Sequence, residues 1–158
     1  MTQLALFQPD IPQNVGATVR LAAGLGLTLH LVEPFGFVYS VAKLRRTALD
    51  YHTLADVKRY ASFAEFDTWR GMAGHRLVLL TTRASQDYTA VTFRPGDVLL
   101  AGSESAGVPD EVHALADLRV RIPLLPGVRS LNVVTALAMV AGEALRQTHG
   151  RGVGQEGE

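Results

Sequence analysis

Two short loops in the second half of the chain carry residue types that build ligand sites. The first is GSESAGVP, from Gly102 to Pro109, and the second is RIPLLPGVRSLN, from Arg121 to Asn132. Each follows a short apolar run with the character of a β-strand. At strand ends in an open α/β sheet, backbone N–H and C=O groups leave the hydrogen-bond ladder and can hold a polar molecule. The two loops therefore predict one shared binding pocket.

The sequence disfavours several other kinds of site. The loop QPDIPQNVG lacks the G-x-G-x-x-G pattern of dinucleotide sites, and no Walker lysine loop occurs. The chain has no cysteine, which removes disulfides, thiolate nucleophiles and cysteine-bound zinc. Its five histidines are scattered without i, i+4 pairing, so we expect surface or packing roles for them and no metal. The serines of GSESAG do not fall at the serine position of the G-x-S-x-G elbow of serine hydrolases, because neither has a glycine both two residues before it and two residues after it.

Length and composition indicate an ordinary globular domain. The chain has 158 residues, of which 47% are hydrophobic and 19% charged, and we expect a single domain over residues 1–149. The Gly-rich residues 150–158 are expected to form a disordered tail. No apolar run reaches the roughly 18 residues of a membrane span, and no signal segment is recognisable at the N-terminus. These features predict a cytoplasmic protein without membrane association.

Charge is informative only locally. Fifteen basic and fifteen acidic residues cancel, so the net charge gives no sign of a nucleic-acid partner. Lys43, Arg45 and Arg46 nevertheless lie close together in the sequence, and Arg20 lies on an expected helix upstream. This cluster fits a small anion-binding face and a solvated helix surface about equally well.

The spacing of apolar residues alternates between the strand period and the helix period along the chain. We expect strands at 3–7, 27–33, 55–60, 75–82, 97–102 and 119–123, and helices at 14–26, 41–49, 63–74, 109–116 and 132–147. Several of the strands are apolar throughout, as in sheets that are buried on both faces. The pattern predicts the α/β class, with a mostly parallel sheet and helices on both faces.

Three stretches in this order resemble the motifs of SPOUT-class RNA methyltransferases: NVGATVR from Asn14 to Arg20, GSESAGVP, and RIP…SLN. The segments FQPDIPQNVGATVRLAAGLGLTLHLVEPFGF from Phe7 and LRRTALDYH from Leu44 further resemble the small single-domain family that 2'-O-methylates the wobble nucleotide of tRNA. The resemblance covers the chain to His149. It implies S-adenosylmethionine as the methyl donor and a C-terminal trefoil knot, which the usual rules of chain connection would not propose.

The resemblance also implies which residues hold the donor. They belong to the end of one strand and to the two loops described above: Leu80, Gly102, Gly107, Ile122, Ser130 and Leu131. The glycines permit a close approach of the backbone to adenosine, where a Cβ would intrude. Pro123 and Pro126 would stiffen the loop that covers the ligand.

On the acceptor side, the resemblance places Arg20 nearest the reacting ribose. Related enzymes are often described with this arginine as the base, but a guanidinium has a pKa of about 12.5 or above, and removing its proton near pH 7 costs roughly 7 kcal/mol. We therefore expect a charged Arg20 that orients the ribose and a phosphate, with Lys43, Arg45 and Arg46 as further RNA contacts. A surface ion pair is the alternative for Arg20.

Asn14, Glu104 and Asn132 complete the expected catalytic set, as polar motif residues that tie loops together or touch the substrate. The two asparagines fit helix caps equally well, and Ser130 could also cap the last helix. In SLNVVTAL, Val134 and Thr135 replace two residues that are commonly polar in the family.

The last helix also has Ala141 and Gly142 where relatives often have a tyrosine. These departures leave three functions open: 2'-O-methylation of the tRNA wobble ribose, 2'-O-methylation at another RNA site, and non-catalytic RNA binding with the same fold. The resemblance implies a homodimer, in which two copies would form a composite tRNA-binding face.

Overall fold

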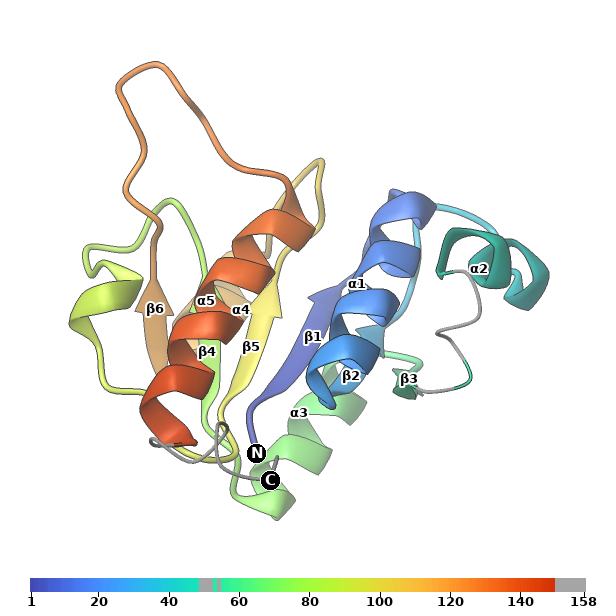
Figure 1. Ribbon diagram of the computed structural model, residues 1–158, viewed down its shortest axis with the longest axis horizontal. Helices are drawn as coiled ribbons and strands as arrows, with labels where there is room; N and C mark the ends of the chain where they lie inside the picture. The colour runs from blue at the N-terminus through green and yellow to red at the C-terminus, as the bar shows by residue number, and fades with distance from the viewer. Residues whose placement is uncertain (49–52, 54, 150–158) are drawn as a thin grey trace, which may run out of the picture.

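The computed structural model describes residues 1–48, 53 and 55–149, and six of its strands form one sheet (Figure 1). The strands are β1 (Gln3–Phe7), β2 (Thr28–Val32), β3 (Asp56–Tyr60), β4 (Leu77–Leu80), β5 (Val98–Ala101) and β6 (Leu118–Val120). Their order across the sheet is β3-β2-β1-β5-β4-β6, and every neighbouring pair is parallel. The predicted α/β class with a parallel sheet is confirmed. The tail expected at residues 150–158 lies outside the described residues.

Helices cover both faces of this sheet. They are α1 (Pro12–Leu25), α2 (Val41–Ala48), α3 (Phe63–Ala73), α4 (Asp110–Leu115) and α5 (Val133–Thr148), with a 3₁₀ turn, η2, at Tyr88–Ala90. Buried side chains of α1 and α5 pack on one face, whereas those of α3 and α4 pack on the other. Helix α2 lies against α1 at the side of the molecule (Figure 1).

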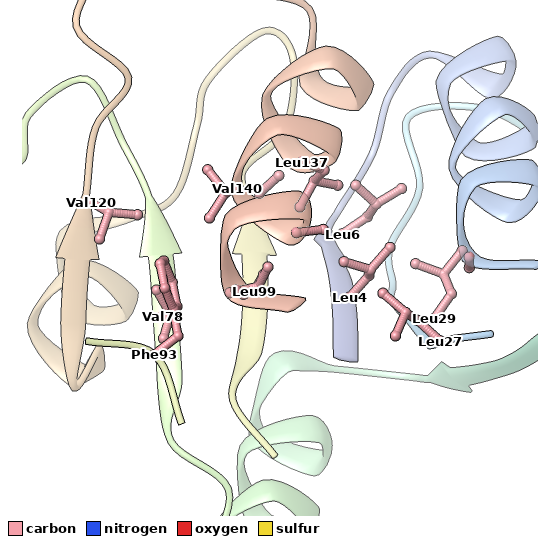
Figure 2. Packing of buried hydrophobic residues seen from close by; sticks show 14 of the residues in the cluster. Leu4, Leu6, Leu27, Leu29, Val78, Phe93, Leu99, Val120, Leu137 and Val140 are labelled. Carbon is pink, nitrogen blue, oxygen red and sulfur yellow. The ribbon is translucent and has the colours of Figure 1, made fainter. Parts of the chain in front are cut away.

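Alternating side chains of the central strands fill both layers of the core. Leu4 and Leu6 of β1 belong to the layer under α1 and α5, which also contains Leu137 and Val140 of α5 (Figure 2). Ala5, between them in sequence, belongs to the opposite layer. Strands that are buried on both faces are apolar at nearly every position, which explains the continuous apolar runs in the sequence.

Most element boundaries differ from expectation by one to three residues, and three of these differences have a clear physical reason. Helix α1 begins at Pro12, two residues before Asn14, because proline suits the first turn of a helix, and Gly26 ends it with φ 67°. Helix α4 begins at Asp110, so Pro109 precedes the helix as its N-cap residue. Strand β6 ends at Val120, because Arg121 makes only an isolated bridge to Asp87 before the chain leaves the sheet.

One polar side chain lies within the layer under α3. His30 of β2 is fully buried among aromatic rings, and its ring centroid is 4.4 Å from that of Trp69. In the neutral imidazole, Nε2–H donates to Gln3 Oε1 at 2.7 Å and Nδ1 accepts from the Tyr60 hydroxyl at 2.9 Å. Burial, followed by the nearby charge of Lys58, lowers the pKa of His30 from 6.5 to about 4.

This histidine makes the stability of the fold dependent on pH. Because the unfolded chain binds a proton at His30 near pH 6.5 and the folded chain does not, the stabilisation is complete above pH 6.5 and is lost as the pH falls toward 4. The free energy of unfolding should therefore fall by as much as about 3 kcal/mol over this range. Urea titrations at several pH values measure it. In His30→Gln, which stays neutral, this part of the slope should disappear; an unchanged slope would contradict the assignment.

Candidate functional site

The loops that follow β4, β5 and β6 line one cavity of about 640 Å³ at the carboxyl ends of these strands. The first turn of α1 and the start of α5 close its remaining sides. Figure 1 shows the long loop after β6 rising beyond the strand ends before the chain enters α5. The two loops that the sequence singled out thus share a single cavity.

The residues expected to bind the donor all line this cavity: Leu80, Gly102, Gly107, Ile122, Ser130 and Leu131. So do three of the four residues expected in the catalytic set: Asn14, Glu104 and Asn132. Segments that lie far apart in the sequence therefore meet at one place. The structure shows this meeting, while the role of each residue stays a prediction.

The loop after β5 closes tightly on itself. Ser103 N–H donates to Gly107 O at 3.0 Å, and Gly107 N–H donates back to Ser103 O at 2.9 Å. Gly107 has φ +65°, a left-handed conformation that favours glycine. A Cβ placed on Gly102 would lie 2.6 Å from the carbonyl carbon of Gly107. Both glycines are thus required by the shape of this cavity wall.

A chain of side-chain hydrogen bonds joins this loop to α1 and α5. Asn14 Nδ2 donates to Glu104 Oε1 at 3.1 Å, and Asn132 Nδ2 donates to Asn14 Oδ1, also at 3.1 Å. Glu104 Oε2 accepts the backbone N–H of Asp10 at 2.9 Å. The three polar motif residues thereby hold three separate segments together along one side of the cavity.

Of the two asparagines that fit helix caps in the sequence, Asn132 is a cap in the structure and Asn14 is not. Asn132 is the N-cap of α5, and its Oδ1 accepts the N–H groups of Val134 at 2.8 Å and Thr135 at 3.2 Å. Asn14 lies buried inside α1 and caps nothing, because the helix already begins at Pro12. Ser130 is not the cap of α5 either. Asn132 therefore combines capping with the link to Asn14.

Several groups at the cavity have shifted acidity. Burial, followed by hydrogen bonding with the Asp10 side chain, raises the pKa of Glu104 above its usual 4.5. Hydrogen bonding with Glu104 and then with Ser105 lowers the pKa of Asp10 below 3.8. Burial, followed by the charges of Arg83 and Arg119, lowers the pKa of His113 below 6.5. Both the Glu104 shift and the His113 shift are toward the neutral form of the side chain.

Of the predicted RNA-contacting residues, Arg20, Lys43 and Arg46 are described, and none of them lines the cavity. Arg20 is exposed on α1, on a side different from the buried Val15 and Val19, and it is not among the residues that line the cavity. Lys43 and Arg46 are exposed on α2. The side chain of Arg45 lies outside the described part of the chain. Arg20, Lys43 and Arg46 are thus exposed side chains that do not line the cavity of their own chain.

Sequence reasoning missed several residues of the cavity wall: Thr81, Thr82, Arg83, His113 and Arg129. The first three follow β4 directly, so the rule that ligands settle at the carboxyl ends of parallel strands could have found them. Arg129 stands next to Ser130 in a loop already singled out. His113 reaches the cavity from α4, and no local pattern indicates this.

Within residues 1–48, 53 and 55–149, no cluster of three or more histidine, aspartate or glutamate side chains could hold a metal ion. Over the same residues, no helix is both long enough and apolar enough to cross a membrane.

The sequence of the chain is similar to those of known RNA methyltransferases over most of its length. The sequence pattern of the SpoU rRNA Methylase family matches residues 1–142. A tRNA (cytidine(34)-2'-O)-methyltransferase of Beijerinckia indica subsp. indica is 57% identical over 144 residues, which cover 91% of this chain and 90% of that protein. A protein of the same name from Escherichia coli (strain K12) is 38% identical over 149 residues, with 93% and 94% of the two chains covered.

Solved structures agree with these relatives. A structure described as "Structural insights into the 2-OH methylation of C/U34 on tRNA" matches with a TM-score of 0.87 and 43% identity, covering 93% of this chain and 95% of that one. The SpoU methyltransferase AviRb from Streptomyces viridochromogenes, solved in complex with the cofactor AdoMet, matches with a TM-score of 0.82 and 28% identity. The match with AviRb covers 93% of this chain and 60% of that chain.

Proposed function

The chain belongs to the SpoU rRNA methylase family, and from this premise we propose that it transfers a methyl group from S-adenosylmethionine to the 2'-hydroxyl of the wobble ribose, nucleotide 34, of a tRNA. The observation that carries the proposal is the single cavity formed by the Gly102 loop and the 121–132 loop. Relatives named for this reaction cover more than nine-tenths of the chain. Substrate and reaction are therefore proposed together.

The cavity residues fit the methyl donor. Its volume of about 640 Å³ lies within the range of small-molecule sites, and its wall combines apolar side chains with backbone groups at strand ends. The Gly102 loop closes tightly because Gly102 lacks a Cβ, and both of its glycines line the cavity in which the donor would bind. When bound, S-adenosylmethionine supplies an electrophilic methyl group on a sulfonium.

The residues of the chain then have to bring a ribose hydroxyl to that methyl group. Placing the hydroxyl in line with the methyl could contribute about 7–11 kcal/mol through effective molarity alone. We assign this orientation to a charged Arg20, whose forked guanidinium can bind a ribose oxygen and a phosphate together. The hydroxyl proton leaves late, to water.

A second copy of the chain would bring the exposed Arg20 and the cavity together. Arg20 is exposed and lies outside the cavity wall of its own chain, so its contribution to a reaction there requires a dimer or the RNA itself to bridge them. We assign a homodimer, in which Arg20 of one subunit joins Lys43, Arg45 and Arg46 on a composite tRNA-binding face. We also assign a cytoplasmic location, a single domain over residues 1–149 and the C-terminal knot, as the family resemblance implies.

The unusual residues of α5 do not favour the non-catalytic alternative. Val133, Ala136 and Val140 are the α5 residues on the cavity wall, whereas Val134 and Thr135 are not among the residues that line it. Ala141 and Gly142 lie further along the helix, also outside the wall. The departures in α5 therefore lie outside the cavity wall.

Transfer of radiolabelled methyl groups to bulk tRNA tests the proposed reaction. The purified protein should label tRNA, and alkaline hydrolysis should leave the label in a resistant dinucleotide, because a 2'-O-methyl group blocks cleavage at that position. Binding of the donor without any transfer to tRNA or other RNA would support a non-catalytic module and contradict the proposal.

A further inference from the structure

The carboxyl groups of Asp10 and Glu104 lie together beside the cavity and share a set of hydrogen bonds. Asp10 precedes α1, and Glu104 belongs to the loop after β5. Glu104 accepts from the backbone N–H of Asp10 and from Asn14 Nδ2, and the Ser105 hydroxyl donates to Asp10 Oδ2. The second carboxyl oxygen of Asp10, Oδ1, is buried and has no hydrogen-bond donor within the described residues.

A proton held between the two carboxyl groups would complete this network. Two ionised carboxylates can only accept hydrogen bonds, and they repel each other when adjacent. A proton on Glu104 would provide a donor beside Asp10, whose buried Oδ1 lacks one in the described part of the chain. We propose that Asp10 and Glu104 share one proton, and that this carboxyl pair fixes the Gly102–Gly107 loop to the first turn of α1. Asp10 is then a positioning residue for the donor site, a role that rests on the proposed function.

The acidity of the two groups supports the shared proton. Burial and the hydrogen bond with Asp10 raise the pKa of Glu104, while the hydrogen bonds from Glu104 and Ser105 lower the pKa of Asp10. Opposite shifts of this kind are expected when two carboxyl groups hold one proton between them.

The pair is surrounded mainly by groups that do not titrate. Asn14 meets it from α1, Ser105 from its own loop, and the backbone of Gly36 from the loop after β2. Asn132 of α5 lies one hydrogen bond further on. Besides Glu104, four titratable or charged side chains line the same cavity: Arg83, His113, Arg121 and Arg129. A variant of Asp10 leaves all of these groups in place, so a comparison with it isolates the carboxyl pair.

The shared proton gives donor binding a definite pH dependence. Because the pKa of Glu104 is raised in the folded protein, its stabilising contribution is present at lower pH and is lost as the pH rises through that pKa. Above it, both carboxyl groups are charged and their repulsion loosens the joint. The affinity for the donor should therefore fall as the pH rises.

The substitution Asp10→Asn tests this, because an amide N–H can donate to an ionised Glu104 and replace the shared proton. The probe is S-adenosylhomocysteine, with binding measured by titration calorimetry upward from pH about 4.5, the usual pKa of glutamate. The natural protein should lose about tenfold in affinity as one proton is released, the effect of losing one hydrogen bond to a charged group. Asp10→Asn should show no such loss. The same pH dependence in both proteins would overturn the proposal.

Infrared spectroscopy gives a second readout that does not require methyl transfer. The difference spectrum between the natural protein and Asp10→Asn should contain the carbonyl band of a protonated carboxyl group, which disappears as the pH rises. Ser105→Ala, which removes only the contact to Asp10 Oδ2, should keep this band. A protein that methylates tRNA but never shows the band would overturn the shared proton and leave the proposed function standing.

Discussion

Replacing Gly102 by alanine is expected to weaken binding of S-adenosylmethionine about 10- to 100-fold, corresponding to about 1–3 kcal/mol of steric strain. The added Cβ would lie 2.6 Å from the carbonyl carbon and 2.7 Å from the Cα of Gly107, and backbone atoms cannot rotate away as a side chain can. The loop must open, and the cavity wall opens with it. Titration calorimetry with the donor measures the effect.

Gly142→Ala is the matched control for this substitution. Gly142 lies in α5, and a Cβ there would meet nothing within 4 Å. Alanine is favoured over glycine in a helix by about 1 kcal/mol, so this variant should be at least as stable as the natural protein and bind the donor normally. Equal donor affinities for Gly102→Ala and Gly142→Ala would show that the Gly102 loop does not form the donor site.

Replacing Arg20 by alanine is expected to reduce methyl transfer by about a hundredfold or more while leaving donor affinity unchanged. Arg20 is exposed and does not line the cavity, so its loss removes a contact to the RNA and not a contact to the donor. Single-turnover transfer at saturating donor, together with calorimetry, measures the two effects separately. Loss of donor binding in Arg20→Ala would show that its role is misassigned.

The substitution Arg20→Lys separates charge from geometry. If Arg20 acts mainly as a positive charge that attracts a phosphate, lysine should retain much of the activity. If the forked guanidinium orients the ribose, lysine should lose most of it, because an ammonium cannot make paired hydrogen bonds. Arg146→Ala provides the control, because Arg146 is an exposed arginine of α5 whose partner is Glu143, and its loss should change neither quantity.

The strand-end loops and the parallel sheet could be predicted from local features. Apolar runs bounded by glycine and proline indicate buried parallel strands, and ligands settle at the carboxyl ends of such strands. The rule therefore placed the Gly102 loop and the 121–132 loop correctly. The helical period also separates Arg20 from the apolar positions Val15 and Val19, which agrees with its exposure.

Contacts between distant segments could not be predicted in the same way. The hydrogen bond between the side chains of Asn132 and Asn14 spans 118 positions, and that between Ser105 and Asp10 spans 95. No local period encodes such a pairing. Asn14 looked like a helix cap because asparagine favours that position, but the preceding proline had already started the helix. Asp10 gave no signal, since an aspartate between two prolines resembles any loop residue.

The most direct test of the central claim is the position of the methyl group on the RNA. Unmodified tRNA should be incubated with the protein and isotopically labelled S-adenosylmethionine, digested, and mapped by tandem mass spectrometry. The account predicts a labelled 2'-O-methyl group on the ribose of nucleotide 34, and about a hundredfold less of it with Arg20→Ala. A label on a base, or on the ribose of another nucleotide, would contradict it.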